Sequence, residues 1–102
     1  MNFLKKLFGG APSTDYKELV KNGAQIIDVR TPAEYKSGHI KGSKNIPLQS
    51  LQQNLGKLNK SKPVITCCAS GARSGAAKSV LENSGFSEVY NGGGWSSLQN
   101  KL

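Results

Sequence analysis

The chain has 102 residues, of which 36% are hydrophobic and 20% are charged, and this length and balance indicate one globular domain rather than two domains or a disordered chain. No apolar run reaches the roughly 20 residues that span a bilayer, and the two cysteines are adjacent, which excludes a membrane-spanning helix and a disulfide-stapled scaffold. The net charge of +8 favours small anions or acidic partners, but the lysines are scattered and no basic helix carries interleaved aromatics, so we expect no nucleic-acid partner.

Residues 1–12 are predicted to form an N-terminal leader ahead of a domain that covers residues 13–102. Residues 3–8 can form a short helix with apolar side chains on one side and Lys5 and Lys6 on the other. We favour a flexible leader, because terminal segments are usually loosely held. A contact with a membrane surface or a partner is the less favoured alternative. The apolar stretch is too short for a secretory signal, which predicts a cytoplasmic protein.

The rest of the chain alternates between helical and extended patterns. Thr31, Pro32 and Glu34 provide an N-cap, a proline at the first helical position and the closing residue of a capping box. The short apolar runs at 25–29 and 63–67 are typical of buried strands. In chain order we predict a helix over 13–22, a strand over 25–29, a short helix from Thr31, a strand over 44–46, a helix over 48–58, a strand over 63–67, a helix over 73–83, a strand over 88–90, a turn over 91–94 and a helix over 95–102.

This alternation predicts an α/β domain in which helices cover both faces of a parallel sheet. Such sheets bind ligands beyond the carboxyl ends of their strands. The segment 68–74, which follows the strand predicted over 63–67, lies at that edge. We therefore expect the chemistry of the protein to reside in this segment.

The segment 68–74 places a thiol between a buried strand and the start of a helix. Small residues allow consecutive backbone N–H groups to turn toward one point, where they bind an anion together with the helix N-terminus. The same field would stabilise a thiolate at Cys68, and the thiolate is the nucleophilic form of cysteine. Arg73, at the far end of the loop, can neutralise charge, or its side chain can close the loop by binding the carbonyl groups of the loop. From these residues alone, a buried structural cysteine on a tight turn remains an equal alternative. The remaining loop residues are Ala69, Ser70, Gly71, Ala72 and Ser74.

Three stretches of the sequence resemble the rhodanese family: residues 26–47, which include Asp28 and Arg30, the loop Cys68-x-x-Gly-x-Arg-Ser, and residues 89–95. The resemblance implies a rhodanese fold with a parallel five-stranded sheet and helices on both faces. It implies a sulfurtransferase that works through a Cys68 persulfide, with thiosulfate as donor and cyanide, a thiol or a protein as acceptor. The family brings no metal or organic cofactor. Asp28 and Arg30 would support the mouth of the site, although a plain structural ion pair is the interpretation we favour.

Loop length separates this family from related phosphatases and arsenate reductases. Four residues lie between cysteine and arginine in the sulfurtransferases, and five in the relatives that bind a tetrahedral oxyanion. Counting from Cys68 to Arg73 gives four, and counting from Cys67 gives five, so a phosphatase or arsenate reductase that uses Cys67 remains an alternative. The pattern Gly71-x-Arg73-Ser74 favours Cys68, with Cys67 as the last strand residue, pointing to the opposite face.

A third possibility is a non-catalytic sulfur carrier or binding module, although the presence of both Cys68 and Arg73 argues against it. The single histidine, His39, is expected to have a structural role, and Glu34 is expected to cap its helix. The cysteines and His39 lack zinc-site spacing, so we predict no metal site. Ala69 stands where many relatives carry a longer basic residue, which weakens thiosulfate as the natural donor.

Overall fold

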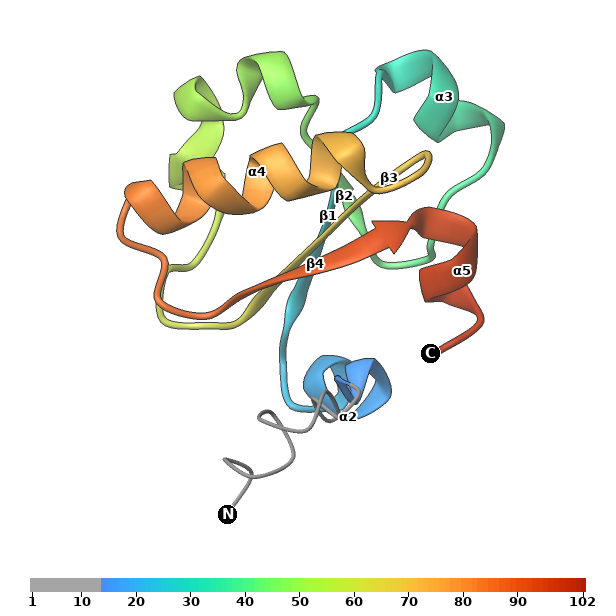
Figure 1. Cartoon of the computed structure of the whole chain (residues 1–102), viewed down its shortest axis with the longest axis horizontal. Helices are drawn as coiled ribbons and strands as arrows, with labels where there is room; N and C mark the ends of the chain where they lie inside the picture. The colour runs from blue at the N-terminus through green and yellow to red at the C-terminus, as the bar shows by residue number, and fades with distance from the viewer. Residues whose placement is uncertain (1–13) are drawn as a thin grey trace, which may run out of the picture.

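The computed structural model describes residues 14–102, and the leader predicted over 1–12 lies outside this part. Four parallel strands form one sheet in the order β2-β1-β3-β4 (Figure 1). The strands are β1 (Gln25–Asp28), β2 (Lys44–Asn45), β3 (Val64–Cys68) and β4 (Val89–Gly94). The helices are α2 (Tyr16–Lys21), α3 (Pro32–Ser37), α4 (Ala72–Asn83) and α5 (Trp95–Gln99), and two 3-10 segments are η1 (Leu48–Ser50) and η2 (Gln52–Lys57).

The predicted parallel sheet with helices on both faces is confirmed, although the described residues hold four strands where the family resemblance predicted five. β1 and β3 coincide with the two apolar runs at 25–29 and 63–67, and β2 and β4 overlap the strands predicted over 44–46 and 88–90. The residue pattern itself therefore predicted four strands, and the fifth was implied only by the family resemblance.

Side-chain alternation along the strands creates two separate cores, one on each face of the sheet. Ile27 of β1 and Val64 of β3 pack on one face, against α4 and the segment that holds η1 and η2. Their sequence neighbours Ile26 and Ile65 pack on the other face, against Leu98 of α5 and the apolar side of α2. Figure 1 shows α4 and α5 on opposite sides of the sheet.

Two predicted elements differ from the structure for identifiable reasons. The helix predicted over 48–58 is instead the 3-10 pair η1 and η2, broken at Asn54, whose backbone is non-helical. The Asn54 side chain donates to the Ser50 carbonyl at 2.7 Å and so competes with the helical hydrogen bond. The turn predicted over 91–94 is wrong, because β4 continues through these residues to Gly94, which pairs with Cys68.

The glycines of β4 serve close packing. A Cβ atom on Gly92 would lie 2.8 Å from the Thr66 carbonyl oxygen and 2.9 Å from the Leu98 side chain, so a larger residue does not fit there. Gly93 has a positive φ of 79°, and the register of β3 and β4 shifts between Thr66 and Cys68. This irregularity brings the end of β4 beside the loop that follows β3.

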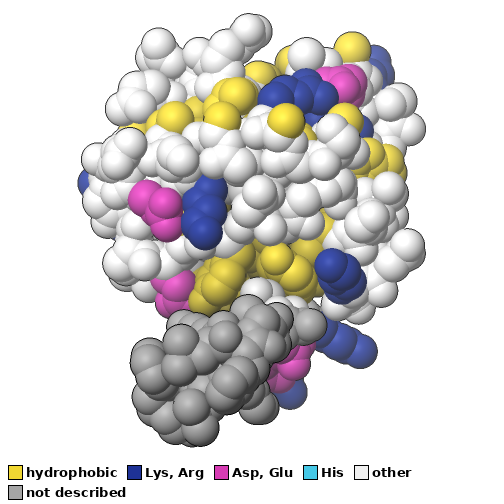
Figure 2. Space-filling view, viewed as in Figure 1, with side chains coloured by type: hydrophobic (Ala, Val, Ile, Leu, Met, Phe, Trp, Pro, Cys, Tyr) yellow, Lys and Arg dark blue, Asp and Glu magenta, His cyan; other side chains and the backbone are white. Residues whose placement is uncertain are grey.

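Charged side chains on the face seen in Figure 2 are scattered among uncharged ones and form no continuous basic area. This distribution agrees with the single lysines of the sequence. No helix in residues 14–102 combines the length and the hydropathy needed to cross a membrane.

Candidate active site

Cys68 is the last residue of β3, and the loop that follows leads directly into α4. The Cys68 residue is 1% exposed and belongs to the core on the α4 face. Gly71, the N-cap of α4, has a φ of 111°, which L side chains rarely adopt, and this conformation turns the loop back over the sulfur. The predicted strand-to-helix loop is therefore present, with Cys68 rather than Cys67 as the last strand residue.

The Cys68 sulfur is surrounded by hydrogen-bond donors from its own loop. The backbone N–H of Gly71 donates to Sγ at 2.9 Å, and the backbone N–H of Ser74 donates at 3.3 Å. Burial raises the pKa of the Cys68 thiol, but the Ser74 hydroxyl and the N–H groups of Ser74, Gly71 and Ser70 outweigh it, so the pKa lies below its ordinary value. The loop thus favours the thiolate, the reactive form of cysteine.

Cys67 has the opposite environment although it is the adjacent residue. It lies on the other face of β3, fully buried among Ile26, Ile65 and Leu98. Burial, followed by the charge of Asp28, raises the pKa of Cys67 to about 12. A thiol in this position stays protonated at neutral pH and faces away from the loop. The strand geometry therefore gives the two cysteines different chemistry.

One of the two predictions for Arg73, that its side chain closes the loop by donating to loop carbonyl groups, is wrong: within residues 14–102 its guanidinium hydrogen bonds go to Glu34. Its guanidinium forms a two-pronged ion pair with Glu34 of α3, with N–O distances of 2.8 and 3.0 Å. The Glu34 carboxylate also accepts from the N–H of Thr31 at 3.0 Å and completes the predicted capping box. The Arg73 hydrogen bond, followed by that of the Thr31 backbone, lowers the pKa of Glu34 to about 2.

Glu34 therefore connects the N-terminus of α3 to the active loop, a role that sequence reasoning missed. Arg73 and Glu34 are 39 positions apart in the sequence. The capping box already accounted for a glutamate at position 34, so nothing in the sequence pointed to a second partner. The two parallel contacts with Glu34 fix the orientation of the planar Arg73 guanidinium. A lysine at this position has a single ammonium group and could not form such a two-pronged pair.

Ser74 links the loop to β4. Its hydroxyl oxygen lies 2.6 Å from Asn91 Oδ1, 2.9 Å from the Gly71 carbonyl oxygen and 3.5 Å from Cys68 Sγ. Asn91 Oδ1 also accepts from the N–H of Gly93 at 3.0 Å. Sequence reasoning did not single out Asn91, which is exposed and lies in a segment that was expected to turn. Its side chain holds the serine that contacts the sulfur.

Asp28 and Arg30 form a buried ion pair behind the loop rather than a part of it. Arg30 Nη2 lies 2.7 Å from Asp28 Oδ2, and the pair is almost inaccessible to solvent. Arg30 also donates to the Gly38 carbonyl at 2.7 Å and stacks 4.8 Å from the centre of the Trp95 ring. These contacts tie both ends of the α3 region to β1 and α5, which fits the structural role that the sequence favoured.

The remaining predicted loop residues occupy the turn between Cys68 and α4. Ala69 and Ser70 are exposed at its tip, and Ala72 begins α4. A Cβ atom on Gly94 would lie 3.0 Å from the Ala69 carbonyl oxygen, so the end of β4 supports the tip of the loop closely. His39 is outside the loop: it stacks on Tyr35 with ring centres 3.8 Å apart, and its Nδ1 lies 2.8 Å from the Tyr35 carbonyl oxygen.

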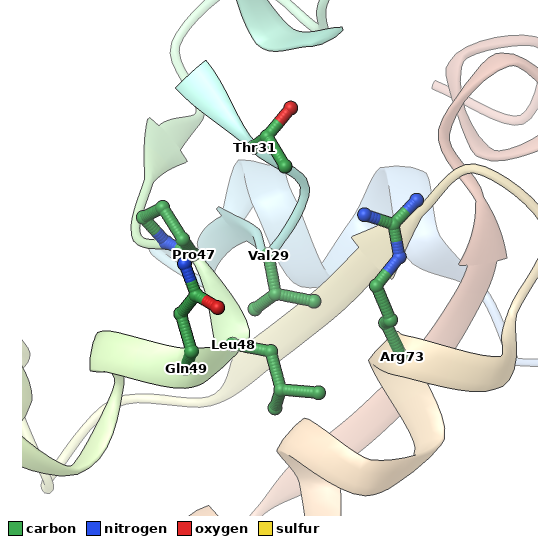
Figure 3. Close-up of a pocket in the computed structure, with 6 residues that line it drawn as sticks. All are labelled: Val29, Thr31, Pro47, Leu48, Gln49 and Arg73. Atoms are coloured by element: carbon green, nitrogen blue, oxygen red, sulfur yellow. The ribbon is translucent and has the colours of Figure 1, made fainter. Parts of the chain in front are cut away.

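A pocket of about 200 Å³ opens beside the loop (Figure 3). Val29 and Leu48 lie between Pro47 on one side and Arg73 on the other. Within residues 14–102, no group of three or more His, Cys, Asp or Glu side chains is arranged to hold a metal ion. The full set of lining residues is Val29, Thr31, Pro47, Leu48, Gln49 and Arg73.

Comparison with known protein families shows to which family this domain belongs. The model of the rhodanese-like domain family matches residues 13–101, nearly the whole chain. The chain belongs to the rhodanese-like domain family. Among relatives of this rhodanese-like protein, the thiosulfate sulfurtransferase GlpE of Ectopseudomonas mendocina is 38% identical over 74 residues, covering 72% of this chain and 68% of the relative. The thiosulfate sulfurtransferase PspE of Escherichia coli is 37% identical over 70 residues, covering 67% of each protein.

Three further similarities come from one relative and two solved structures. An uncharacterized protein, YqhL of Bacillus subtilis, is 46% identical over 68 residues, which are 67% of this chain and about half (54%) of YqhL. The crystal structure of reduced Bacillus anthracis CoADR-RHD matches with a TM-score of 0.74 at 37% identity, covering 85% of this chain and 15% of the other. A rhodanese with anions from E. coli matches with a TM-score of 0.69 at 34% identity, covering 72% of this chain and 89% of the other. These similarities confirm the rhodanese fold.

Proposed function

We propose that this rhodanese-like domain is a sulfurtransferase whose nucleophile is Cys68. The observation that carries the proposal is the Cys68 sulfur at the centre of the loop, where it accepts hydrogen bonds from the N–H groups of Gly71 and Ser74. Relatives named thiosulfate sulfurtransferase, at 37–38% identity, support the same reaction class. Thiosulfate is the test donor, and a thiol or cyanide is the test acceptor.

The first half of the reaction loads sulfur onto the protein. The Cys68 thiolate attacks the outer sulfur of thiosulfate, a new S–S bond forms, and the S–S bond of thiosulfate breaks with its electron pair leaving on sulfite. The persulfide carries one negative charge on its outer sulfur. Backbone N–H groups and the N-terminus of the 12-residue helix α4 are suited to stabilise that charge without rearrangement.

The second half of the reaction unloads the sulfur. An acceptor thiolate or cyanide attacks the outer sulfur, the S–S bond to Cys68 breaks, and the cysteine thiolate is restored. Covalent catalysis of this kind divides one transfer into two easier steps. Arg73 and Glu34 hold the end of the loop in position during both steps, since their ion pair joins α4 to α3.

Intact mass measurement without reductant tests the proposal. After incubation with thiosulfate, wild type and Cys67→Ser should gain one sulfur atom that cyanide removes, and Cys68→Ser should gain none. Gain on Cys68→Ser but not on Cys67→Ser would refute the assignment and favour the phosphatase or arsenate reductase alternative. Hydrolysis of an aryl phosphate, measured on the same samples, checks that alternative directly. A persulfide that forms but passes to no acceptor would indicate a sulfur carrier.

A cytoplasmic location is part of the proposal. Cys67 and Cys68 are both free, and a persulfide enzyme needs its thiol reduced between cycles. Fractionation of cells that express the native gene, with detection by antibody, tests the location. Recovery in the soluble cytoplasmic fraction supports it, and recovery in an oxidising compartment contradicts it.

A further inference from the structure

The pocket beside the loop suits a small apolar group. Its floor and one wall are formed by Val29, Pro47 and Leu48, which offer hydrocarbon surface. A pocket of about 150 Å³ accommodates a benzene ring, so a volume of about 200 Å³ has room for roughly six to eight non-hydrogen atoms. Thiosulfate and cyanide are smaller than this and would leave most of the apolar surface uncovered.

The pocket is close enough to Cys68 to hold part of a reacting molecule. Asp28 pairs with Cys67 in the register of β1 and β3, so the next residues, Val29 and Cys68, follow side by side. Both side chains belong to the core on the α4 face. Neighbouring strands are about 4.8 Å apart, and Arg73 belongs both to the loop and to the pocket wall. A sulfur atom on Cys68 is thus about one strand spacing from the pocket floor.

The charge around the pocket does not select an inorganic anion. Arg73 is the one charged residue among the six that line it, and the two-pronged contact with Glu34 balances its charge. Ala69 adds no charge at the tip of the loop. Thr31 and Gln49 provide uncharged polar groups around the apolar floor. An uncharged organic group therefore gains more binding free energy in this pocket than an inorganic anion does.

We propose that the sulfur acceptor is an organic thiol whose hydrocarbon part, of about six to eight carbons, occupies the pocket lined by Val29, Pro47 and Leu48. This inference rests on the proposed sulfurtransferase function and names its acceptor class. The thiol gives its proton to solvent, and its thiolate attacks the outer sulfur of the Cys68 persulfide. A new S–S bond forms on the organic sulfur, the bond to Cys68 breaks, and the products are an organic persulfide and the Cys68 thiolate.

A series of straight-chain alkanethiols tests the inference, because these thiols differ in length while their acidity stays nearly constant. The protein is loaded with thiosulfate, separated from excess donor and mixed with each thiol from ethanethiol to decanethiol. Loss of the sulfur atom is followed by intact mass. The second-order rate constant should rise about three- to fourfold for each added methylene until the pocket is full. Discharge to cyanide provides the reference for each preparation.

Two substitutions at Leu48 change the pocket in opposite directions. Leu48→Phe fills it and should remove the dependence on chain length, whereas Leu48→Ala enlarges it and should move the best chain length upward. Leu55→Ala is the matched control, because Leu55 is also partly buried against the same core but does not line the pocket. It should keep the wild-type dependence on chain length. The ratio of hexanethiol to cyanide rate constants is compared, which cancels differences in folded fraction.

The outcomes separate the inference from the function on which it rests. Equal rate constants along the series, with normal discharge to cyanide, would overturn the apolar acceptor and leave the sulfurtransferase proposal intact. A chain-length dependence that persists unchanged in both Leu48 variants would also overturn it, because the selectivity would then arise elsewhere. If no persulfide forms on Cys68, both the function and the inference fail.

Discussion

Replacement of Asp28 by alanine should lower the free energy of unfolding far more than an ordinary surface substitution does. Arg30 donates to both carboxylate oxygens of Asp28, at 2.7 to 3.1 Å from Nε and Nη2, and its own backbone N–H donates to the same group at 3.1 Å. The exposed fractions of the two side chains are 4% for Arg30 and zero for Asp28, so water cannot replace the carboxylate. Asp28→Ala therefore leaves a buried guanidinium without its counter-charge.

The expected loss is about 3–5 kcal/mol, the usual cost of removing one partner of a buried ion pair. A domain of this size has a total stability of about 5–15 kcal/mol, so the variant would be marginally folded. The melting temperature should fall by roughly 15–30 °C. The effect extends to the active loop, because Arg30 also binds the Glu34 and Gly38 carbonyl groups and so fixes the position of α3.

Urea denaturation followed by Trp95 fluorescence measures the loss. The double variant Asp28→Leu, Arg30→Met removes both charges, and it should be clearly more stable than Asp28→Ala because no charge is left buried and unpaired. A loss below about 1 kcal/mol for Asp28→Ala, or a double variant no more stable than the single one, would refute the reasoning.

Three further predictions concern packing, pH and reactivity. Gly92→Ala should lower the free energy of unfolding by about 1–3 kcal/mol, because its Cβ would lie 2.8 Å from a backbone oxygen; wild-type stability in urea would contradict this. Arg73, followed by the Thr31 backbone, lowers the pKa of Glu34 from 4.5 to about 2, so the ionised carboxylate stabilises the fold above the ordinary pKa, and this contribution is lost as the pH falls toward 2. Glu34→Gln should therefore show a shallower decline in stability between about pH 5 and pH 2, measured by denaturation at each pH; an unchanged decline would exclude the carboxylate as its source. Iodoacetamide should modify Cys68 at a pH below the ordinary thiol range while Cys67 stays unmodified in the folded protein, as mass spectrometry of the single Cys→Ser variants can verify.

Sequence reasoning succeeded where the physical signal was local. The capping box at Thr31 and Glu34 depends on residues three positions apart and is present as predicted. The opposite orientation of Cys67 and Cys68 follows from strand alternation, which holds wherever both faces of a strand are covered. The α-helix predicted over 48–58 was wrong. The leucine spacing that suggested it carries no information about the Asn54 side chain, which competes with the backbone for the Ser50 carbonyl.

The residues that hold the loop in place were visible only in part. Glu34 was identified as a cap but not as the partner of Arg73, because one carboxylate can accept from both and the sequence reveals only the nearer partner. Asn91 was not singled out, since its contact with Ser74 depends on the register of β3 and β4. The apolar pocket likewise joins segments that are distant in the chain.

The sequence by itself determined the alternating α/β architecture and the small-residue loop after a buried strand. These features can be read from the sequence because periodicity, capping and strand alternation act over a few residues. The preference for Cys68 over Cys67 came from the resemblance to the family pattern Gly71-x-Arg73-Ser74. The tertiary structure decided which groups surround the sulfur, which carboxylate balances Arg73 and what surface a second reactant meets. These properties depend on the packing of α3, η1 and β4 around the end of β3, and packing brings together residues that no local pattern connects.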